Sequence, residues 1–210
     1  MKTTTGKRLR DTFLVSSLLV SALMIAAPSQ ADDAKPTRVR GAITAVEEDL
    51  LKVHSNRGED LQIHLTKDTQ VRGVTLAQVS EIKPGSYIGS AAVPQPDGTL
   101  KALEVHVFPP EMAGTGDGHR AFDLGKDSTM TNGSVGDLVT SNGRTITVNY
   151  KGGQKKIVIP DDVPIVNLVP ADRSLLKPGV KVVLQAQKGE NGALNAVSIS
   201  AGENGITPPM

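Results

Sequence analysis

The chain has 210 residues, of which 38% are hydrophobic and 21% are charged, and it contains neither cysteine nor tryptophan. Four of its 23 basic and one of its 22 acidic side chains fall within residues 1–31, so the remainder carries 19 basic and 21 acidic groups. This slightly acidic balance lacks the positive field that gathers nucleic-acid phosphates. The absence of cysteine excludes disulfides, so the stability of the fold must come from packing.

Residues 1–31 have the pattern of a secretory signal peptide. Four basic residues lie in the first ten positions, a mostly apolar run covers 13–27, and small residues precede a predicted cleavage site after Ala31. The apolar run is shorter than the ~20 residues that a membrane-spanning helix needs, which favours a signal peptide over a membrane anchor. We therefore expect export to the periplasm and no membrane span after cleavage.

The rest of the chain contains an internal repeat. The segment Ser80–Gly85 (SEIKPG) recurs 94 positions later as Ser174–Gly179 (SLLKPG), and Gly98–Ala102 recurs at the same distance as Gly192–Ala196. Near the start of each copy the shift is 92, so the second copy gains residues after its first segment. A repeat of this length predicts two copies of one domain.

The repeat divides the chain into segments. We predict a first domain over 38–107, a Gly/Pro-rich linker over 108–129, a second domain over 130–201 and a flexible tail over 202–210. Each copy is small for an independent core, but two copies packed together would bury more surface.

Within each copy the apolar residues alternate with polar ones, which predicts β-strands. In the first copy, the predicted strands cover 38–46, 51–53, 61–65, 87–93 and 100–107. Between the third and fourth of them, Leu76, Val79 and Ile82 recur every three residues and predict one short helix before Pro84. The second copy repeats this order, with a short helix over 171–176.

Three strands, a short helix and two strands are the order of an OB barrel, a five-stranded Greek-key barrel. A generic antiparallel sandwich is the alternative, and the position of the helix in both copies favours the barrel. The predicted fold class is therefore all-β, with two tandem OB-like five-stranded barrels.

The segment around the linker concentrates potential metal ligands. His106, Met112, Asp117 and His119 lie within fourteen positions of one another. Imidazole with carboxylate suits zinc, and imidazole with thioether suits copper. The two histidines do not have the spacing of a compact metal motif, however, and the alternative is a structural linker whose phenylalanines hold it against the barrels.

Two other functions are disfavoured by the sequence. OB barrels that bind single-stranded nucleic acid stack bases on aromatic side chains, and only two tyrosines and two phenylalanines follow the signal peptide. No catalytic constellation is present either, because Ser80 and Ser174 lie in neither a GxSxG motif nor near a histidine in the sequence. We therefore predict neither nucleic-acid binding nor enzymatic activity.

Several motifs resemble a widespread bacterial domain of unknown function that has an OB-like barrel. They are the repeated Gly-x-Ile/Val, the Lys-Pro-Gly turn, and the Asp-Gly or Asn-Gly hairpin before Leu-x-Ala. The linker from Phe108 to His119, the run at 128–132 and the terminal Thr-Pro-Pro-Met resemble a subgroup of exported alphaproteobacterial proteins. The family implies no established activity. Some relatives are labelled metal-transporter permease, and this chain departs from that label because no second long apolar run follows its signal peptide.

Two functions remain from these observations. The first is a non-enzymatic periplasmic binding or interaction module, with a protein or small ligand on a barrel face or in a cleft under the linker. The alternative is a periplasmic metal-binding or metal-delivery protein that uses His106, Met112, Asp117 and His119 for zinc or copper.

Overall fold

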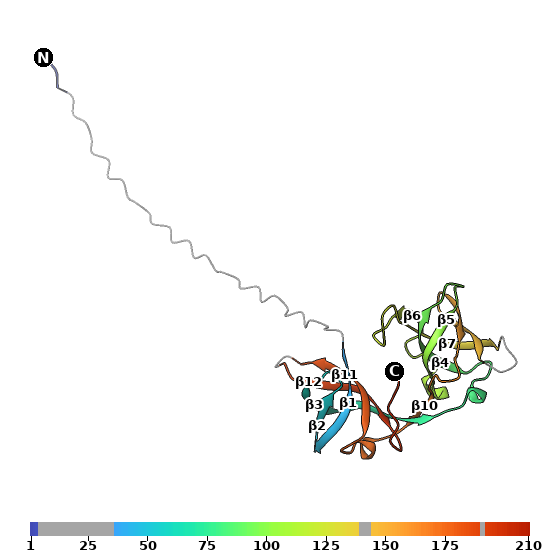
Figure 1. Cartoon of the computed structure of the whole chain (residues 1–210). Coiled ribbons are helices and arrows are strands. Elements are labelled where there is room, and N and C mark those ends of the chain that lie inside the picture. The colour runs from blue at the N-terminus through green and yellow to red at the C-terminus, as the bar shows by residue number, and fades with distance from the viewer. Residues whose placement is uncertain (4–35, 139–143, 190–191) are drawn as a thin grey trace. The chain divides into compact units, whose positions relative to one another are not determined.

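The computed structural model describes residues 1–3, 36–138, 144–189 and 192–210 of the chain. This part of the protein is all-β, as predicted, with three single 3-10 turns (Figure 1). Its strands are β1 (Thr37–Glu47), β2 (Leu50–Ser55), β3 (Asp60–Leu76), β4 (Tyr87–Pro94), β5 (Leu100–Val107), β6 (Gly118–Ala121), β7 (Thr129–Leu138), β8 (Thr145–Tyr150), β9 (Gly153–Val158), β10 (Ile165–Pro170), β11 (Lys181–Lys188) and β12 (Leu194–Gly202).

The predicted signal peptide and its cleavage site lie outside the described residues, apart from the first three positions. Among the residues that are described, no helix has the length and apolar character needed to cross a membrane.

Strands from the two ends of the folded unit close a five-stranded barrel. β1 pairs with β2 and β11, β2 pairs with β3, and β12 pairs with both β11 and β3. The β3–β12 contact is parallel and the other four are antiparallel. Closing the ring in this way removes the free sheet edges on which other chains could add.

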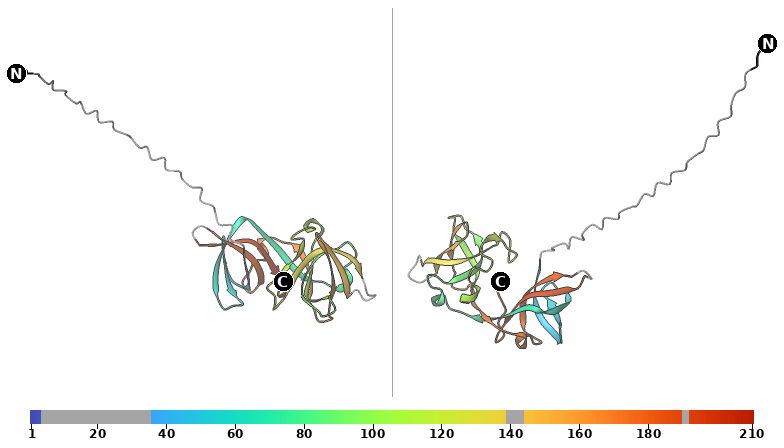
Figure 2. Two further views of the ribbon diagram at one scale, coloured as in Figure 1. Left: turned by 90° about the horizontal axis from the view of Figure 1, so that it is seen from above. Right: turned by 180° about the vertical axis from the view of Figure 1, so that it is seen from behind.

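The middle of the chain forms a second ring of pairings. β4 lies between β5 and β7, β8 lies between β7 and β9, and a short parallel contact between β5 and β9 closes the ring. Figure 2 shows the result in colour: blue β1 and β2 lie with red β11 and β12, and green β4 and β5 lie with the yellow strands.

Each ring therefore contains strands from both copies of the repeat, which corrects the domain boundaries predicted at 38–107 and 130–201. The hairpin β4–β5 of the first copy pairs with β7 and β9 of the second, and the hairpin β11–β12 of the second copy pairs with β1 and β3 of the first. The physical reason lies after the third strand of each copy. There the chain continues in extended form, rich in β-branched residues, instead of turning back onto its own barrel.

The two crossing segments pair with each other. The last part of β3 and the whole of β10 run antiparallel, with Val74 opposite Leu168. These two residues are themselves related by the 94-residue shift, so the crossing lies at the centre of a two-fold relation between the copies.

The strand registers repeat with the sequence. Leu194 pairs with Ile63 in the first barrel, and the equivalent Leu100 pairs with Ile157 in the second. The register also shifts at equivalent points of the two hairpins, after Ala91 and after Gln185. The copies thus share one local structure, and they differ in which barrel receives each hairpin.

The first strand of each copy has a glycine where a neighbouring strand approaches closely. A Cβ atom on Gly41 would collide with the carbonyl oxygen of His54, and one on Gly133 would collide with that of Asn149. Both glycines are therefore required by the close approach of the neighbouring strand.

Each ring has its own hydrophobic core, and a third cluster lies at the crossing. Ile43, Leu51 and Ile63 belong to the core of the first ring, and Ile88, Ile146 and Ile157 to that of the second. The third cluster contains Val74, Tyr87, Phe108, Val166, Leu168 and Met210.

Three parts of the chain differ from the sequence prediction. The expected short helices are single 3-10 turns, η1 (Val79–Glu81) and η3 (Arg173–Leu175), in keeping with an apolar spacing of three residues. The linker contains a third such turn, η2 (Pro110–Met112), and the strand β6, which pairs with β7. The predicted loose tail packs instead, because Ile206 and Met210 join the third cluster.

Candidate functional site

A cavity of about 220 Å³ lies where the crossing strands, both barrels and the linker meet. Arg38 and Val183 line it from the first barrel, Asn132 from the second, and Thr115 from the linker. Its apolar wall consists of Phe108, Met112, Phe122, Met130, Leu168 and Met210. Polar side chains, among them Arg72, Asn132 and Ser200, line the rest of it. A hollow in which polar groups converge beside an apolar wall is a common form of small-ligand site.

Three arginines line this cavity: Arg38, Arg72 and Arg120. Arg38 forms a 2.5 Å ion pair with Asp123. Arg72 and Arg120 form no ion pair with any carboxylate of the described residues, and donate instead to the Gln70 side-chain oxygen and the Gly116 carbonyl. Arg72, which is half-buried, and Arg120, which is exposed, therefore line the cavity without an ion-pair partner among the described residues.

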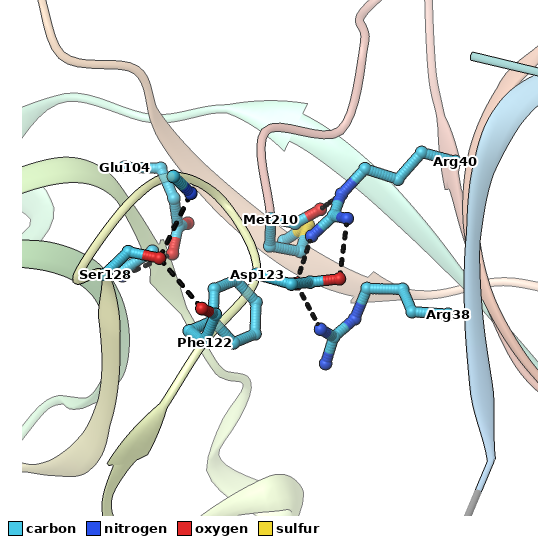
Figure 3. Close-up of polar contacts among 9 residues, drawn as sticks. Arg38, Arg40, Glu104, Phe122, Asp123, Ser128 and Met210 are labelled. Atoms are coloured by element: carbon cyan, nitrogen blue, oxygen red, sulfur yellow. Dashed lines mark hydrogen bonds and ion pairs between the residues drawn. The ribbon is translucent and has the colours of Figure 1, made fainter. Parts of the chain in front are cut away.

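Asp123 holds the linker against the first barrel, as Figure 3 shows. Its carboxylate accepts hydrogen bonds from Arg38 at 2.5 Å and from Arg40 at 2.8 and 3.0 Å. The guanidinium of Arg38 also lies 4.3 Å from the centre of the Phe122 ring, within the range of a cation–π contact. The hydrogen bond from Arg40 and the charge of both arginines lower the pKa of Asp123 to about 2.

The loop that carries Asp123 is closed by a buried serine. Ser128 Oγ donates to the carbonyl of Phe122 at 3.0 Å and accepts from the amide of Gly125 at 3.1 Å (Figure 3). Because these bonds fix the turn, the carboxylate of Asp123 is directed toward the two arginines of β1.

Replacing Asp123 with Asn should loosen this attachment. The carboxylate is about two-fifths exposed, so solvent screening limits its contribution to about 1 kcal/mol or less. Because the folded-state pKa is lowered, the stabilisation is present above the unfolded pKa of about 3.9 and is lost as the pH falls toward 2. Urea unfolding at pH 6 and pH 2.5 measures it: Asp123→Asn should be less stable than wild type at pH 6, and this difference should shrink at pH 2.5.

Asp49→Asn is the matched control, because Asp49 forms a single pair with Arg173 and is more exposed. We expect it to change the free energy of unfolding by a smaller amount at both pH values. An equal effect of the two substitutions would contradict the special role of Asp123.

Asn132 contributes an unsatisfied acceptor to the cavity. Its side chain is 95% buried, and its Nδ2 donates to the carbonyl of Thr115 at 3.1 Å. This bond determines which way the amide points, since a carbonyl can only accept. Oδ1 of Asn132 then has no hydrogen-bond donor among the described residues. Buried polar atoms without a partner are uncommon and often mark a place where a ligand or water binds.

A buried carboxylate–imidazole pair supports the cavity from the second barrel. Glu104 is fully buried and accepts hydrogen bonds from the amide of Ala91 at 2.8 Å and from Nδ1 of His106 at 3.0 Å. The His106 ring packs edge-on against Phe108, with 4.9 Å between the ring centres. Because Glu104 binds Nδ1, the other ring nitrogen is the one left for further contacts of His106.

The four predicted metal ligands are only partly brought together. His106 and Met112 line the same cavity. Asp117 accepts from the amide of Lys151 at 2.6 Å and from the hydroxyl of Tyr87 at 3.3 Å, and burial with this carboxylate raises the pKa of Tyr87 to about 12. Asp117 therefore binds protein donors.

His119 lies on β6 and has separate contacts. Its Nδ1 hydrogen-bonds with Thr131 Oγ1 at 2.8 Å, and its ring stacks on Tyr150. Burial, followed by the charge of Lys155, lowers the pKa of His119. Throughout the described ranges, no three His, Asp or Glu side chains are grouped so that they could hold a metal ion.

The sequence analysis missed Arg72, Arg120 and Asn132. A signal for two of these positions exists in the repeat itself, because cavity residues differ between the copies. Arg72 aligns with Val166 at a shift of 94, and Asn132 aligns with Arg40 at a shift of 92. Arg120 lies in the linker and has no counterpart. At both pairs of equivalent positions, one copy has an arginine and the other copy has an uncharged residue. Such differences between the copies were the available indication of a site in the sequence.

Comparison with known proteins adds no relative: no family model, no curated protein and no solved structure matches the chain.

Proposed function

We propose that this protein is a non-enzymatic binding module whose small ligand occupies the cavity at the crossing of the two copies. The observation that supports this most is the composition of the cavity. An apolar wall adjoins the half-buried Arg72 and the exposed Arg120, neither with a described counter-charge, and one buried acceptor without a donor. Such groups are costly to keep unpaired unless a ligand or water satisfies them.

The origin of the lining residues supports this proposal. The linker, which is the unduplicated part of the chain, supplies Thr115 and Arg120 to the cavity. A function added to a duplicated scaffold is expected in such an insert.

The finer assignments of fold and location belong to the same proposal. We infer that both rings are OB-like barrels, because each has three consecutive strands completed by a hairpin in Greek-key order. We also infer that the protein is exported to the periplasm, from the basic start and apolar run of residues 1–31. Its resemblance to exported proteins with a domain of unknown function is part of this inference.

A ligand screen by NMR tests the proposed function. We expect at least one class among small neutral, cationic and anionic compounds to shift the amide signals of His106, Asn132 and Ser200, which surround the cavity. Ser200→Phe should abolish these shifts because the larger side chain fills the cavity. Zinc and copper(II) are included in the screen, since the metal alternative stays a prediction.

Ser174→Phe is the control, because Ser174 is exposed and lines a different surface pocket. It should leave ligand binding unchanged. Shifts confined to the region of Ser174, or shifts that persist in a folded Ser200→Phe variant, would contradict a ligand site at the crossing. Metal-induced shifts centred on His119 and Asp117 would favour the metal alternative instead.

A further inference from the structure

We propose that the cavity binds a small oxyanion that carries its own hydrogen-bond donor, with Arg72 and Arg120 on its anionic oxygens and Asn132 Oδ1 accepting from the donor. This inference rests on the proposed function and names the chemical class of its ligand.

The charge of the cavity lining favours an anion. The described lining of the cavity includes three arginines and His106 but no aspartate or glutamate. Only Arg38 is balanced, by Asp123, which itself lies outside this lining. An unbalanced guanidinium in a partly enclosed site attracts an anion, and planar guanidinium groups match carboxylate and phosphate oxygens in pairs.

Arg72 lies in an environment that suits an anion. This half-buried residue is on the crossing part of β3, opposite Pro170 of β10 and Ser200 of β12. Its guanidinium donates to the neutral side-chain oxygen of Gln70, which leaves most of its five donors for another group. Burial lowers the pKa of Arg72, the direction expected for a cation that is not compensated by a carboxylate.

Arg120 lies beside Asn132. Arg120 Nη1 donates to the Gly116 carbonyl at 2.7 Å, which orients the guanidinium. A Cβ atom on Gly116 would lie 3.2 Å from Arg120 Nη2 and 3.0 Å from Asn132 Nδ2. The cation and the Nδ2 end of the amide therefore flank the same glycine. The Oδ1 end lies near Gly89 and His106, because a Cβ atom on Gly89 would be 2.7 Å from Oδ1 and would collide with His106 Nε2. A ligand that bridges Arg120 and Oδ1 therefore spans the amide of Asn132.

The unpaired acceptor selects among anions. Because the Thr115 carbonyl orients the amide, Oδ1 of Asn132 needs a donor from outside the described residues. An anion without a donor would leave this atom to water alone and would add repulsion. A ligand that combines negative oxygens with an O–H or N–H group therefore fits this position better.

The size of the cavity limits the ligand further. A volume of about 220 Å³ corresponds to roughly seven water molecules. Hydrogen phosphate or a short hydroxycarboxylate fits this volume, and the apolar wall of Phe108, Met112 and Leu168 suits a short carbon chain. The two probes share the required chemistry, and the experiment separates them.

Four anions test this inference by calorimetry at pH 7. Phosphate is compared with sulfate, which has a similar shape but no proton to donate, and lactate is compared with propionate, which lacks the hydroxyl. We expect phosphate to bind at least about tenfold more tightly than sulfate, or lactate at least about tenfold more tightly than propionate. The reason is that the anion without a donor leaves a buried acceptor unpaired, which is costly. Charge alone predicts the opposite order for phosphate and sulfate.

Variants identify the residues. Arg72→Gln and Arg120→Gln should each raise the Kd of the preferred anion by at least about tenfold, since each removes charge-assisted hydrogen bonds. Asn132→Leu should abolish the preference for the donor-bearing anion, so that the two anions of a pair bind with about the same Kd. Arg173→Gln is the control and should leave the Kd unchanged, because Arg173 pairs with Asp49 outside this cavity.

The outcomes separate this inference from the proposed function. Neutral compounds that shift the cavity amides while all four anions fail would overturn the anion site and leave the binding module in place. If no compound of the screen binds at the cavity, both the anion site and the proposed binding module are overturned. Equal binding of phosphate and sulfate, together with equal binding of lactate and propionate, would overturn the role of Asn132.

Discussion

Oxidation of a Lys101→Cys/Val158→Cys double variant is expected to give one disulfide within a single chain, in high yield. Lys101 on β5 and Val158 on β9 are Cα partners in the parallel contact that closes the second ring. Neighbouring strands are about 4.8 Å apart, which falls within the 4.4–6.8 Å between Cα atoms that a disulfide accepts. The natural chain has no cysteine, so no other bridge competes.

The matched control is Lys101→Cys/His64→Cys. Asn195, the repeat equivalent of Lys101, pairs with His64 in the first ring. If each copy formed its own barrel, Lys101 would occupy that place and the control pair would close instead. Peptide mapping and non-reducing electrophoresis distinguish the results. A 64–101 bridge would refute the exchange of hairpins, and a covalent dimer of the 101–158 variant would place the exchange between two chains.

Glu104→Leu is expected to destabilise the folded protein by about 3–5 kcal/mol, because removing a buried carboxylate leaves the groups that hydrogen-bond to it without a partner. The carboxylate is fully buried and receives hydrogen bonds from Ala91 and His106. Its removal leaves two buried donors unpaired in the wall of the second barrel. The free energy of unfolding in urea, followed by circular dichroism, measures the effect.

Two further variants make this prediction specific. Glu104→Gln keeps an acceptor and should cost less than Glu104→Leu. The double variant Glu104→Leu/His106→Leu should recover part of the loss, because replacing both members of a buried polar pair with apolar groups is tolerated better than removing one. A loss below 1 kcal/mol for Glu104→Leu, or no recovery in the double variant, would show that the pair does not support the barrel.

The strands of this protein were predictable because they depend on the alternation of apolar and polar residues along the chain. Strands predicted over 87–93 and 100–107 correspond to β4 and β5, and Leu51 and Ile63 of two other predicted strands are buried in the first core. The predicted helices were wrong in type, since one turn followed by a Lys-Pro-Gly sequence leaves no room for an α-helix.

The candidate site was predictable only in its general place. The linker was expected to carry function, and it does contribute Met112 and Arg120 to the cavity. Arg72 was not identified, because an arginine in an extended segment has no spacing motif. Asn132 acquires its significance from one bond to Thr115, which no local pattern encodes.

The amino-acid sequence by itself determined an all-β chain with two equivalent copies, because side-chain period and turn residues act over a few neighbours. The tertiary structure alone decided which barrel receives which hairpin. The two hairpins share their apolar pattern and register, so local energies do not distinguish the two assignments, and the choice follows from the crossing of β3 and β10. That crossing also creates the cavity, where Arg72, Arg120 and Asn132 meet from distant parts of the chain.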